Sequence, residues 1–326
     1  MGKKMNALVS IIITTKNEEK NIENCLRSIK SQTYLSRGSK ATLREPQKNI
    51  EIIVVDNNST DKTKEIAKKY TLNVFNFGPE RSAQRNFGML KKAKGKYVMY
   101  LDADMILSST VIEKAVEKLE NEEFLALYIP EIILGNSYWS RVRRFERSFY
   151  DGTVIDCVRI IRTDIFKKLG GFDETMTGPE DWDLDKRVRN EGKAALLCKY
   201  DFEEMNRKIL DTRYSILDEK GLKKLMNLTL EPVIFHNEAN FNLRKYLAKK
   251  KYYSKSFSDY VVKWGNQDAD IKKQFGLFYR CFGVFCENGK WRNLVKFPLK
   301  TSGVFFLRLS VGVVFLEEKI KKIIKK

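Results

Sequence analysis

The stretch that decides the fold is Lys96-Tyr97-Val98-Met99-Tyr100-Leu101-Asp102-Ala103-Asp104. Its apolar run is typical of a strand that is buried on both faces of a parallel sheet. Asp102 and Asp104 follow at the carboxyl end of this strand, where open α/β sheets form their ligand crevice. Two carboxylates on one side of an extended segment suit a hard divalent cation that carries phosphates. For an isolated pair, the alternative is a solvated turn in which an aspartate caps a helix.

Strand and helix patterns alternate along the first half of the chain. Apolar runs at 8–13, 50–55 and 72–77 indicate three further strands, each followed by a helical pattern. Asn17 is predicted to cap the first helix, residues 81–93 are predicted to be helical, and Thr110 with Glu113 has the form of a capping box. Strands separated by helices predict an α/β fold with a largely parallel sheet and right-handed crossovers.

Composition limits the class of protein. The 326 residues are 43% hydrophobic, which is enough for one large or two small packed domains. Lys and Arg number 61 against 42 Asp and Glu, and the net charge of +19 implies an anionic partner or surface. The five cysteines form no Cys-x-x-Cys pair, so we expect a reduced, cytoplasmic compartment. We expect neither a signal peptide nor a membrane span, because no uninterrupted apolar stretch reaches about 18 residues.

Known nucleotide-binding signatures disfavour two classes of enzyme. The chain has no Gly-x-x-x-x-Gly-Lys-Ser/Thr loop and no Gly-x-Gly-x-x-Gly after its first strand, which argues against a P-loop ATPase and a nicotinamide dehydrogenase. Thr14, Asp56 and Asp102 instead follow three strands that should end along one edge of the sheet. Several such strand ends indicate a nucleotide crevice, because carboxylates accept hydrogen bonds from base N–H groups and ribose hydroxyls.

Six short motifs resemble, in order, those of the inverting glycosyltransferases of family 2, which have the GT-A fold. They are VSIIITTKNEE at 9–19, VVDNNSTD at 54–61, AQRNFG at 83–88, LDAD at 101–104, GGFDE at 170–174 and EDWDL at 180–184. The segment Thr14-Thr15-Lys16 departs from the Pro-Thr-Tyr that the family more often has. The resemblance implies a Rossmann-like GT-A catalytic domain over residues 1–240 and an extension over 241–326.

The resemblance implies how a nucleotide-sugar donor would be held. Thr14, Glu18 and Asp56 would contact the nucleoside, and Arg85 would lie near the base or the diphosphate. Asp102 would reach the ribose or the metal.

The implied cofactor is Mg²⁺ or Mn²⁺, with Asp104 as a ligand. The metal would neutralise charge on the departing nucleotide. His236, the only histidine, follows a strand-like run and is a further candidate ligand of the metal or the diphosphate. A packed, hydrogen-bonded histidine is the alternative.

The catalytic candidates are Asp181 and, second to it, Glu180. They follow the turn Gly178-Pro179 and open a predicted helix. Inversion needs an acceptor oxygen opposite the leaving diphosphate and a base for its proton, and the resemblance implies that this acidic pair supplies the base. With an ionised lipid phosphate as acceptor, Asp181 would orient it instead, and compensation of the helix dipole is the structural alternative.

Trp182 and Gly171 are the residues expected at the acceptor site. Trp182 also suits the hydrophobic core.

Two other functional classes stay open. A nucleic-acid-binding protein would explain the basic charge, but acidic strand ends would repel a phosphate backbone, so we expect no nucleic-acid partner. A sugar-phosphate nucleotidyltransferase uses similar metal sites, but it usually has a basic, Gly-rich loop where this chain has Asn17-Glu18-Glu19.

The last 83 residues carry most of the surplus charge. From Arg244 to Lys326 there are 20 Lys and Arg against 6 Asp and Glu, which is +14 of the total. Aromatic and apolar residues from Leu243 to Trp264 recur at helical spacing with Lys245, Lys249, Lys251 and Lys255 among them. This pattern is typical of a basic amphipathic helix on an anionic membrane surface.

The apolar segment 303–316 is interrupted by Arg308 and Ser310, and we expect it to be too short to span a membrane. The resulting hypothesis is a peripheral enzyme at the cytoplasmic face of the cell membrane, acting on a glycan or a lipid-linked acceptor. Helices that only cover the sheet are the alternative.

Overall fold

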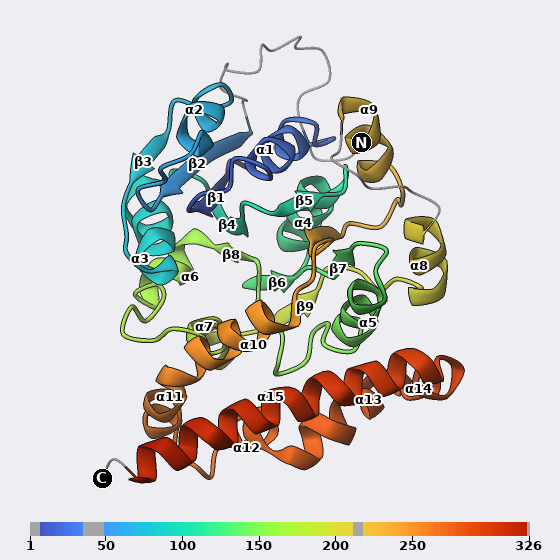
Figure 1. Cartoon of the computed structure of the whole chain (residues 1–326). Coiled ribbons are helices and arrows are strands. Elements are labelled where there is room, and N and C mark those ends of the chain that lie inside the picture. The colour runs from blue at the N-terminus through green and yellow to red at the C-terminus, as the bar shows by residue number, and fades with distance from the viewer. Residues whose placement is uncertain (1–6, 35–48, 211–217, 325–326) are drawn as a thin grey trace.

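A computed structural model describes residues 7–34, 49–210 and 218–324. Its centre is a seven-stranded sheet (Figure 1) with the strand order β3 (Val74–Asn76), β2 (Ile50–Asp56), β1 (Val9–Thr15), β4 (Tyr97–Asp102), β8 (Ile160–Arg162), β6 (Ala126–Tyr128) and β9 (Ala194–Leu196). Only β8 among these strands runs antiparallel to its neighbours. A second, three-stranded sheet has the order β5 (Met105–Leu107), β10 (Ile234–Asn237) and β7 (Glu131–Leu134). The predicted, largely parallel α/β architecture is confirmed.

Helices cover both faces of the large sheet because its central strands are apolar on both sides. Val9, Ile11 and Ile13 of β1 face one layer and Ile12 faces the other. The first layer contains α1 (Ile22–Lys30), α2 (Thr63–Lys68) and α4 (Val111–Asn121). The second contains the π-helix η1 (Phe87–Lys92), α6 (Thr163–Lys168) and α7 (Glu180–Glu191). The remaining helices before the C-terminal layer are α3 (Arg81–Asn86), α5 (Tyr138–Arg147), α8 (Phe202–Leu210) and α9 (Glu219–Met226).

Two local predictions of helix capping were wrong. Asn17 does not cap α1, which begins at Ile22; its side-chain oxygen accepts a hydrogen bond from the Thr60 N–H instead. Thr110 and Glu113 form no capping box, because their side chains bond to Leu230 and Thr33 respectively. The prediction of a helical segment over 81–93 is confirmed over 81–92, where α3 is followed directly by the π-helix η1.

The C-terminal helices form a layer below the sheets (Figure 1). The predicted continuous helix over 243–264 is interrupted, because the 3-10 turn η2 (Ser254–Ser256) separates α10 (Leu243–Tyr253) from α11 (Phe257–Trp264). Tyr260 of α11 is buried in the protein, whereas Tyr252 of α10 is 40% exposed. The layer also contains α12 (Ala269–Phe275), the π-helix η3 (Tyr279–Gly283), α13 (Val284–Cys286), the 3-10 turn η4 (Glu287–Gly289), α14 (Arg292–Lys296) and α15 (Pro298–Ile324).

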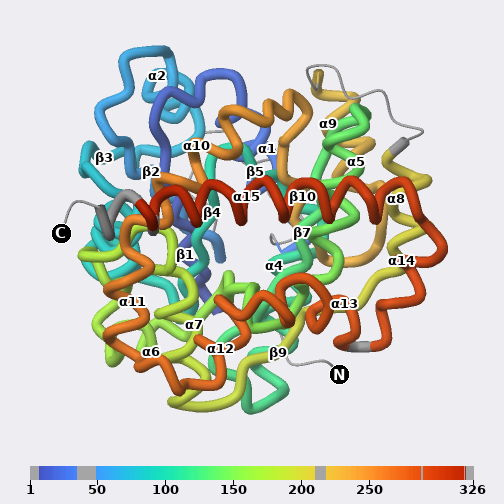
Figure 2. The backbone as a smooth tube through the Cα atoms, turned by 60° about the horizontal axis from the view of Figure 1, so that its bottom comes forward, coloured from blue at the N-terminus to red at the C-terminus, as the bar shows by residue number. Residues whose placement is uncertain are grey.

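The last helix is longer than the sequence pattern indicated. Within α15, the segment Pro298–Glu318 has a mean hydropathy of 1.6 and is 22% buried, so by length and composition it could cross a membrane. The expectation that this region is too short was therefore wrong, because Arg308 and Ser310 do not interrupt the helix. Figure 2 shows α15 crossing the outer face of the molecule, and it packs against α5 and α10.

Candidate active site

The two aspartates of the central strand lie where the sequence placed them. Asp102 is the last residue of β4, and Asp104 lies in the turn that leads into β5. In the sheet register Thr14 is opposite Asp102, and the Thr14 hydroxyl lies 3.4 Å from the Asp102 carboxylate. The parallel strands β1 and β4 therefore bring these two predicted donor-binding residues together.

Arg85 connects the strand end to the catalytic candidate. This α3 side chain is only 1% exposed and lies over the Tyr100 ring, 4.4 Å from its centre. Its Nη1 lies 2.8 Å from Asp181 Oδ1, and its Nη2 lies 3.2 Å from Asp102 Oδ1. Burial raises the pKa of Asp102, but the charges of Arg85 and Arg81 outweigh this effect and hold that pKa below its ordinary range.

The two members of the acidic pair have different environments. Glu180 is 2% exposed; its carboxylate accepts hydrogen bonds from the Gly178 N–H and, at 3.2 Å, from Arg81. Burial raises the pKa of Glu180. Asp181 is 22% exposed. The helix α7 begins at Glu180, as predicted. The buried Glu180 carboxylate therefore lies at the start of the helix, and the Asp181 carboxylate next to it is partly exposed.

A second set of residues surrounds Asp104. His236, at the end of β10, lies 3.2 Å from Asp104 through Nε2 and 2.6 Å from the buried Glu131 through Nδ1. Burial lowers the pKa of His236, but the charges of Asp104 and Glu131 raise it more, so its pKa is well above the ordinary value. The strand pairing of β10 with β5 thus brings together two candidate metal ligands that are far apart in sequence.

The residues around Asp104 fit a divalent cation held partly by a substrate. Asp104 Oδ1 is buried and has no hydrogen-bond partner, so it leaves one ligand position unused. Asp102 faces Arg85 and Arg81 instead. In the described part of the chain no group of three or more His, Cys, Asp and Glu side chains is arranged around a common metal position. A cation bound by one or two protein ligands and by phosphate oxygens is typical of Mg²⁺ sites.

The other two predicted nucleoside contacts lie in different settings. The Glu18 side chain accepts a hydrogen bond from Asn21, and burial together with the charges of Asp104, Asp102 and Asp61 raises its pKa despite that bond. Asp56 is completely buried and accepts both of its described hydrogen bonds from Ser59, one from the backbone N–H at 2.7 Å. The Asp56 carboxylate therefore stabilises the turn that follows β2, as aspartate side chains commonly do by accepting hydrogen bonds from residues a few positions later.

Two residues of α10 reach the site and were not predicted there. Burial lowers the pKa of Lys249, but the charges of Tyr253, Asp102 and Asp104 raise it more. The Arg81 guanidinium lies 5.1 Å from the centre of the Tyr253 ring. A Cβ at Gly178 (φ +108°) would lie 2.6 Å from Tyr253 Cβ, so this turn admits only glycine. The sequence feature that contains both Lys249 and Tyr253 is the basic and aromatic pattern of segment 245–257.

The two predicted acceptor residues have structural contacts. Trp182 donates a hydrogen bond to the Ile155 carbonyl and packs against Phe257 and Tyr260 below α7. At Gly171 (φ +79°) a Cβ would lie 2.4 Å from Asn86 Oδ1, the atom that accepts a hydrogen bond from the Phe172 N–H. Both positions therefore have a packing explanation, and their acceptor role stays a prediction.

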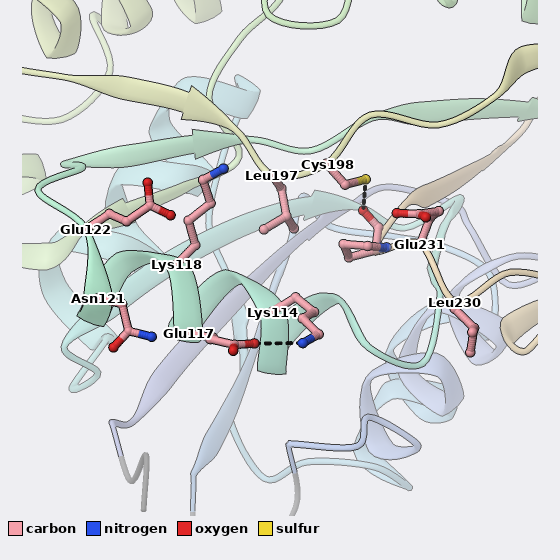
Figure 3. A pocket seen from close by; sticks show the side chains of 10 residues that line it. Lys114, Glu117, Lys118, Asn121, Glu122, Leu197, Cys198, Leu230 and Glu231 are labelled. Atoms are coloured by element: carbon pink, nitrogen blue, oxygen red, sulfur yellow. Dashed lines mark hydrogen bonds and ion pairs between the residues drawn. The ribbon is translucent and has the colours of Figure 1, made fainter. Parts of the chain in front are cut away.

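A hollow of about 370 Å³ lies away from all these residues. Figure 3 shows it between α4 and the segments around Cys198 and Glu231, with a Lys114–Glu117 ion pair along its edge. None of the predicted site residues lines it, and we do not assign it to the active site.

Comparison with known proteins agrees with this geometry. Residues 10–171 match the family model described as glycosyl transferase family 2. The chain belongs to this family. It is 30% identical over 195 residues to an uncharacterised glycosyltransferase of Rickettsia typhi, covering 54% of this chain and 57% of that one. It is 34% identical over 126 residues to the Escherichia coli UDP-Glc:alpha-D-GlcNAc-diphosphoundecaprenol beta-1,3-glucosyltransferase WfaP, covering 37% and 45%.

The family 2 chain also resembles a solved structure. The mannosyltransferase PcManGT of Pyrobaculum calidifontis, in complex with GDP-Man and Mn²⁺, superposes with a TM-score of 0.55 over 96% of this chain and 88% of that one. At 16% identity this likeness shows the GT-A fold. The two relatives named above are matched over about half of their length. The family is described as one of glycosyl transferases, which agrees with the class of enzyme expected from the sequence.

Proposed function

We propose that this glycosyltransferase moves a sugar from a nucleotide-diphosphate sugar to an acceptor with inversion at the anomeric carbon. The observation that carries the proposal is the bridge by which Arg85 holds Asp102 and Asp181 at one edge of the sheet. A donor at the ends of β1 and β4 would place its diphosphate beside Asp104, and its sugar would extend toward Asp181.

Asp181 is the group proposed to take the proton. The acceptor hydroxyl attacks the anomeric carbon on the face opposite the diphosphate and gives its proton to an Asp181 oxygen. The bond from that carbon to the phosphate oxygen breaks, and its electron pair leaves with the nucleotide. Arg85 fixes the orientation of the carboxylate, and Glu180 is occupied by Gly178 and Arg81, which favours Asp181 over its neighbour.

Asp104 would hold a divalent cation, Mg²⁺ or Mn²⁺, and His236 would join it as a ligand with its Nε2 deprotonated. When bound, the cation would neutralise charge on the diphosphate. Lys249 and Arg81 add two positive charges close to Asp102, and the charge of Asp102 contributes to raising the pKa of both side chains. These cations would stabilise the negative charge that develops on the leaving group.

Thr14, Glu18 and Asp102 are proposed to contact the nucleoside. Asp56 supports their loop through Ser59 in the structure, so its part in donor binding is indirect in this proposal.

The acceptor is proposed to be a lipid-linked saccharide presented at an anionic membrane. WfaP, one of the relatives, acts by its name on a diphosphoundecaprenol-linked sugar. In this chain an exposed apolar row follows one face of α15, at Leu299, Phe306, Leu309, Val313, Leu316 and Ile320. Leu277, Phe278 and Phe282 near η3 are also exposed, and Phe282 packs against Phe305 of α15; Lys272 and Lys296 are exposed nearby in sequence. Such a surface is typical of proteins that lie in a membrane interface, here proposed at the cytoplasmic face.

The test of catalysis is the Asp181→Asn variant with the donor identified by thermal shift. Nucleotide-sugars are screened with Mn²⁺ and Mg²⁺, and the true donor raises the melting temperature because it binds only the native state. We expect Asp181→Asn to keep this shift and to lose turnover by about 1,000-fold or more. Asp164→Asn, at an exposed acid of α6, should keep both. Turnover of Asp181→Asn within tenfold of the unmodified protein contradicts the base role and leaves Asp181 as an orienting group.

A further inference from the structure

A group of buried charges lies beside the active site, where α5, α10, η3 and α15 meet. Its cations are Arg143, Lys250, Arg280 and Arg308, and its carboxylates are Glu146 and Glu238; together we call these six residues the cation cluster. Arg143 lies 2.5 Å from Glu146 and 3.2 Å from Glu238. Arg308 of α15 lies 3.3 Å from Glu146 and donates to the Tyr150 hydroxyl at 2.8 Å. Four cations against two carboxylates leave two positive charges without a balancing acid.

Two guanidinium nitrogens of the cluster have no acceptor. Arg308 is 9% exposed; its Nε and Nη2 are bonded, but Nη1 is buried without a hydrogen-bond partner. Arg280 Nη1 is also buried and unpartnered, and within the described residues Arg280 makes no ion pair. A buried donor without an acceptor lowers stability, so such a donor is retained more readily where a ligand supplies the acceptor.

Lys250 adds a third cation, for which no ion pair is described among residues 7–34, 49–210 and 218–324. It is partly buried, and the contact described for its Nζ is the Tyr246 ring, 5.4 Å away. Burial, together with the charges of Arg143 and Arg280, lowers the pKa of Lys250 to about 7. The surroundings of Lys250 therefore disfavour its positive charge. An anion bound there would offset the repulsion from Arg143 and Arg280.

The position of the cluster identifies the kind of anion. On one side, Glu238 follows His236 of the proposed metal site by two residues. On the other side, Arg308 lies in α15 about 100° around the helix from the exposed Leu309, so the cluster and the apolar row occupy neighbouring faces of this helix. Figure 2 shows α15 on the outer face of the molecule, between α10 and the segment of α12 and α13. A ligand that satisfies both sides has a phosphate group joined to an apolar chain.

We propose that the cation cluster binds the phosphate or diphosphate group of a lipid whose chain lies along the apolar row of α15. This inference rests on the proposed function for its biological meaning, since it would hold the phosphate end of the lipid-linked acceptor. Arg280 Nη1, Arg308 Nη1 and Lys250 Nζ would donate to the phosphate oxygens, which are strong acceptors for guanidinium and ammonium groups.

The test uses the double variant Lys250→Gln/Arg280→Gln, which removes the two cluster cations that have no described ion pair. Its matched control is Lys68→Gln/Lys167→Gln, which removes the positive charges of two exposed lysines of α2 and α6. Sedimentation is measured with phosphatidylcholine vesicles, alone and with phosphatidic acid or a polyprenyl diphosphate, and inorganic pyrophosphate is added as a soluble competitor. We expect the cluster variant to bind phosphate-bearing vesicles at least tenfold more weakly, and the control to lose less than threefold.

The three probes separate the sources of the phosphate. Stronger dependence on the cluster with polyprenyl diphosphate than with phosphatidic acid supports the acceptor lipid, and equal dependence supports a general lipid phosphate. An effect confined to inorganic pyrophosphate overturns the lipid proposal. Equal losses in the cluster variant and the control also overturn it, because they would report only net charge.

Stability distinguishes a ligand site from a structural one. Without ligand, the cluster variant should melt at the same or a higher temperature than the unmodified protein, because it removes cations that repel one another. A lower melting temperature would show that these residues hold the fold together and would contradict the proposal. Donor binding, followed by the nucleotide-sugar thermal shift, should be unchanged, and its absence in the unmodified protein would count against the proposed function alone.

Discussion

Arg85 and Asp181 form an ion pair of 2.8 Å across 96 residues of sequence. The guanidinium is almost completely buried, and the carboxylate is partly open to the crevice. Because the same guanidinium also contacts Asp102, it fixes the distance between the strand that is proposed to bind the donor and the helix that is proposed to carry the base. Buried arginines suit this task, since their planar fork can hold two carboxylates at once.

The first prediction concerns this bridge. Arg85→Lys keeps the charge, but an ammonium group cannot hold both carboxylates in the same geometry. We expect turnover to fall by about 100-fold, and the free energy of unfolding to fall by about 2 kcal/mol through the lost charged hydrogen bond. Steady-state kinetics and urea unfolding measure the two effects.

The control for this variant is Arg162→Lys at the end of β8. Arg162 donates hydrogen bonds to the Leu119 and Phe124 carbonyls, so its replacement should lower stability without a comparable loss of turnover. If both variants lose turnover in proportion to stability, Arg85 acts only through the fold.

The second prediction concerns the proposed metal ligand. Asp104→Ala removes a carboxylate with one unpartnered oxygen and should abolish metal-dependent turnover while the melting temperature without metal stays within a few degrees. The stabilisation of the unmodified protein by Mn²⁺ plus nucleotide should also be lost. Asp164→Ala serves as the matched control, and full activity of Asp104→Ala would remove Asp104 from the site.

The strands of the large sheet could be predicted from the sequence because each corresponds to a local run of apolar residues. The apolar runs that became β1, β2 and β4 are buried on both faces, which explains why each is continuous and bounded by polar residues. The interruption at η2 and the length of α15 could not be predicted in this way. Both depend on which side chains find protein partners, as Tyr260 does and Leu309 does not.

The site was predictable where a residue ends a strand. Thr14 and Asp102 follow directly from the parallel register of β1 and β4. Asp56 also ends a strand, but its side chain bonds to its own loop, and periodicity cannot distinguish these two outcomes. Lys249 and Tyr253 belong to a helix whose path over the site is set by tertiary packing, so their place was not foreseen.

The third prediction concerns pH. Asp151 is 3% exposed, and burial raises its pKa from 3.8 to about 7 although Lys290 and Arg147 lower it. Between these two pH values the folded protein binds more protons than the unfolded chain, so stability should fall as pH rises from about 4 to about 7.

Asp151→Asn removes this titration. At pH 8 the variant should be more stable by about 2–4 kcal/mol, since each pKa unit corresponds to about 1.4 kcal/mol. At pH 4 the two proteins should unfold alike. Urea unfolding at both pH values measures the difference, and Asp164→Asn, which is exposed, should show none. An Asp151→Asn variant that is no more stable at pH 8 than at pH 4, relative to the unmodified protein, contradicts the prediction.

The last prediction concerns the apolar row of α15. Leu309 and Val313 are 68% and 56% exposed, and one turn of helix separates them. Leu309→Glu/Val313→Glu places two charges in the row and should weaken binding to anionic vesicles by at least about tenfold, because each side chain loses roughly 1.5–3 kcal/mol of apolar burial. Sedimentation at low salt measures this loss.

The control is Leu72→Glu/Leu230→Glu, which places the same charges at leucines that are 69% and 88% exposed in other parts of the chain. These two leucines precede β3 and β10. Their replacement should change vesicle binding by less than about threefold relative to the unmodified protein, which is the effect expected from the change in net charge alone. Turnover on a soluble acceptor should be the same in both double variants, because neither touches Arg85 or Asp181. If the control weakens vesicle binding as much as the α15 variant does, attraction is purely electrostatic, and the apolar row has some other partner than the membrane.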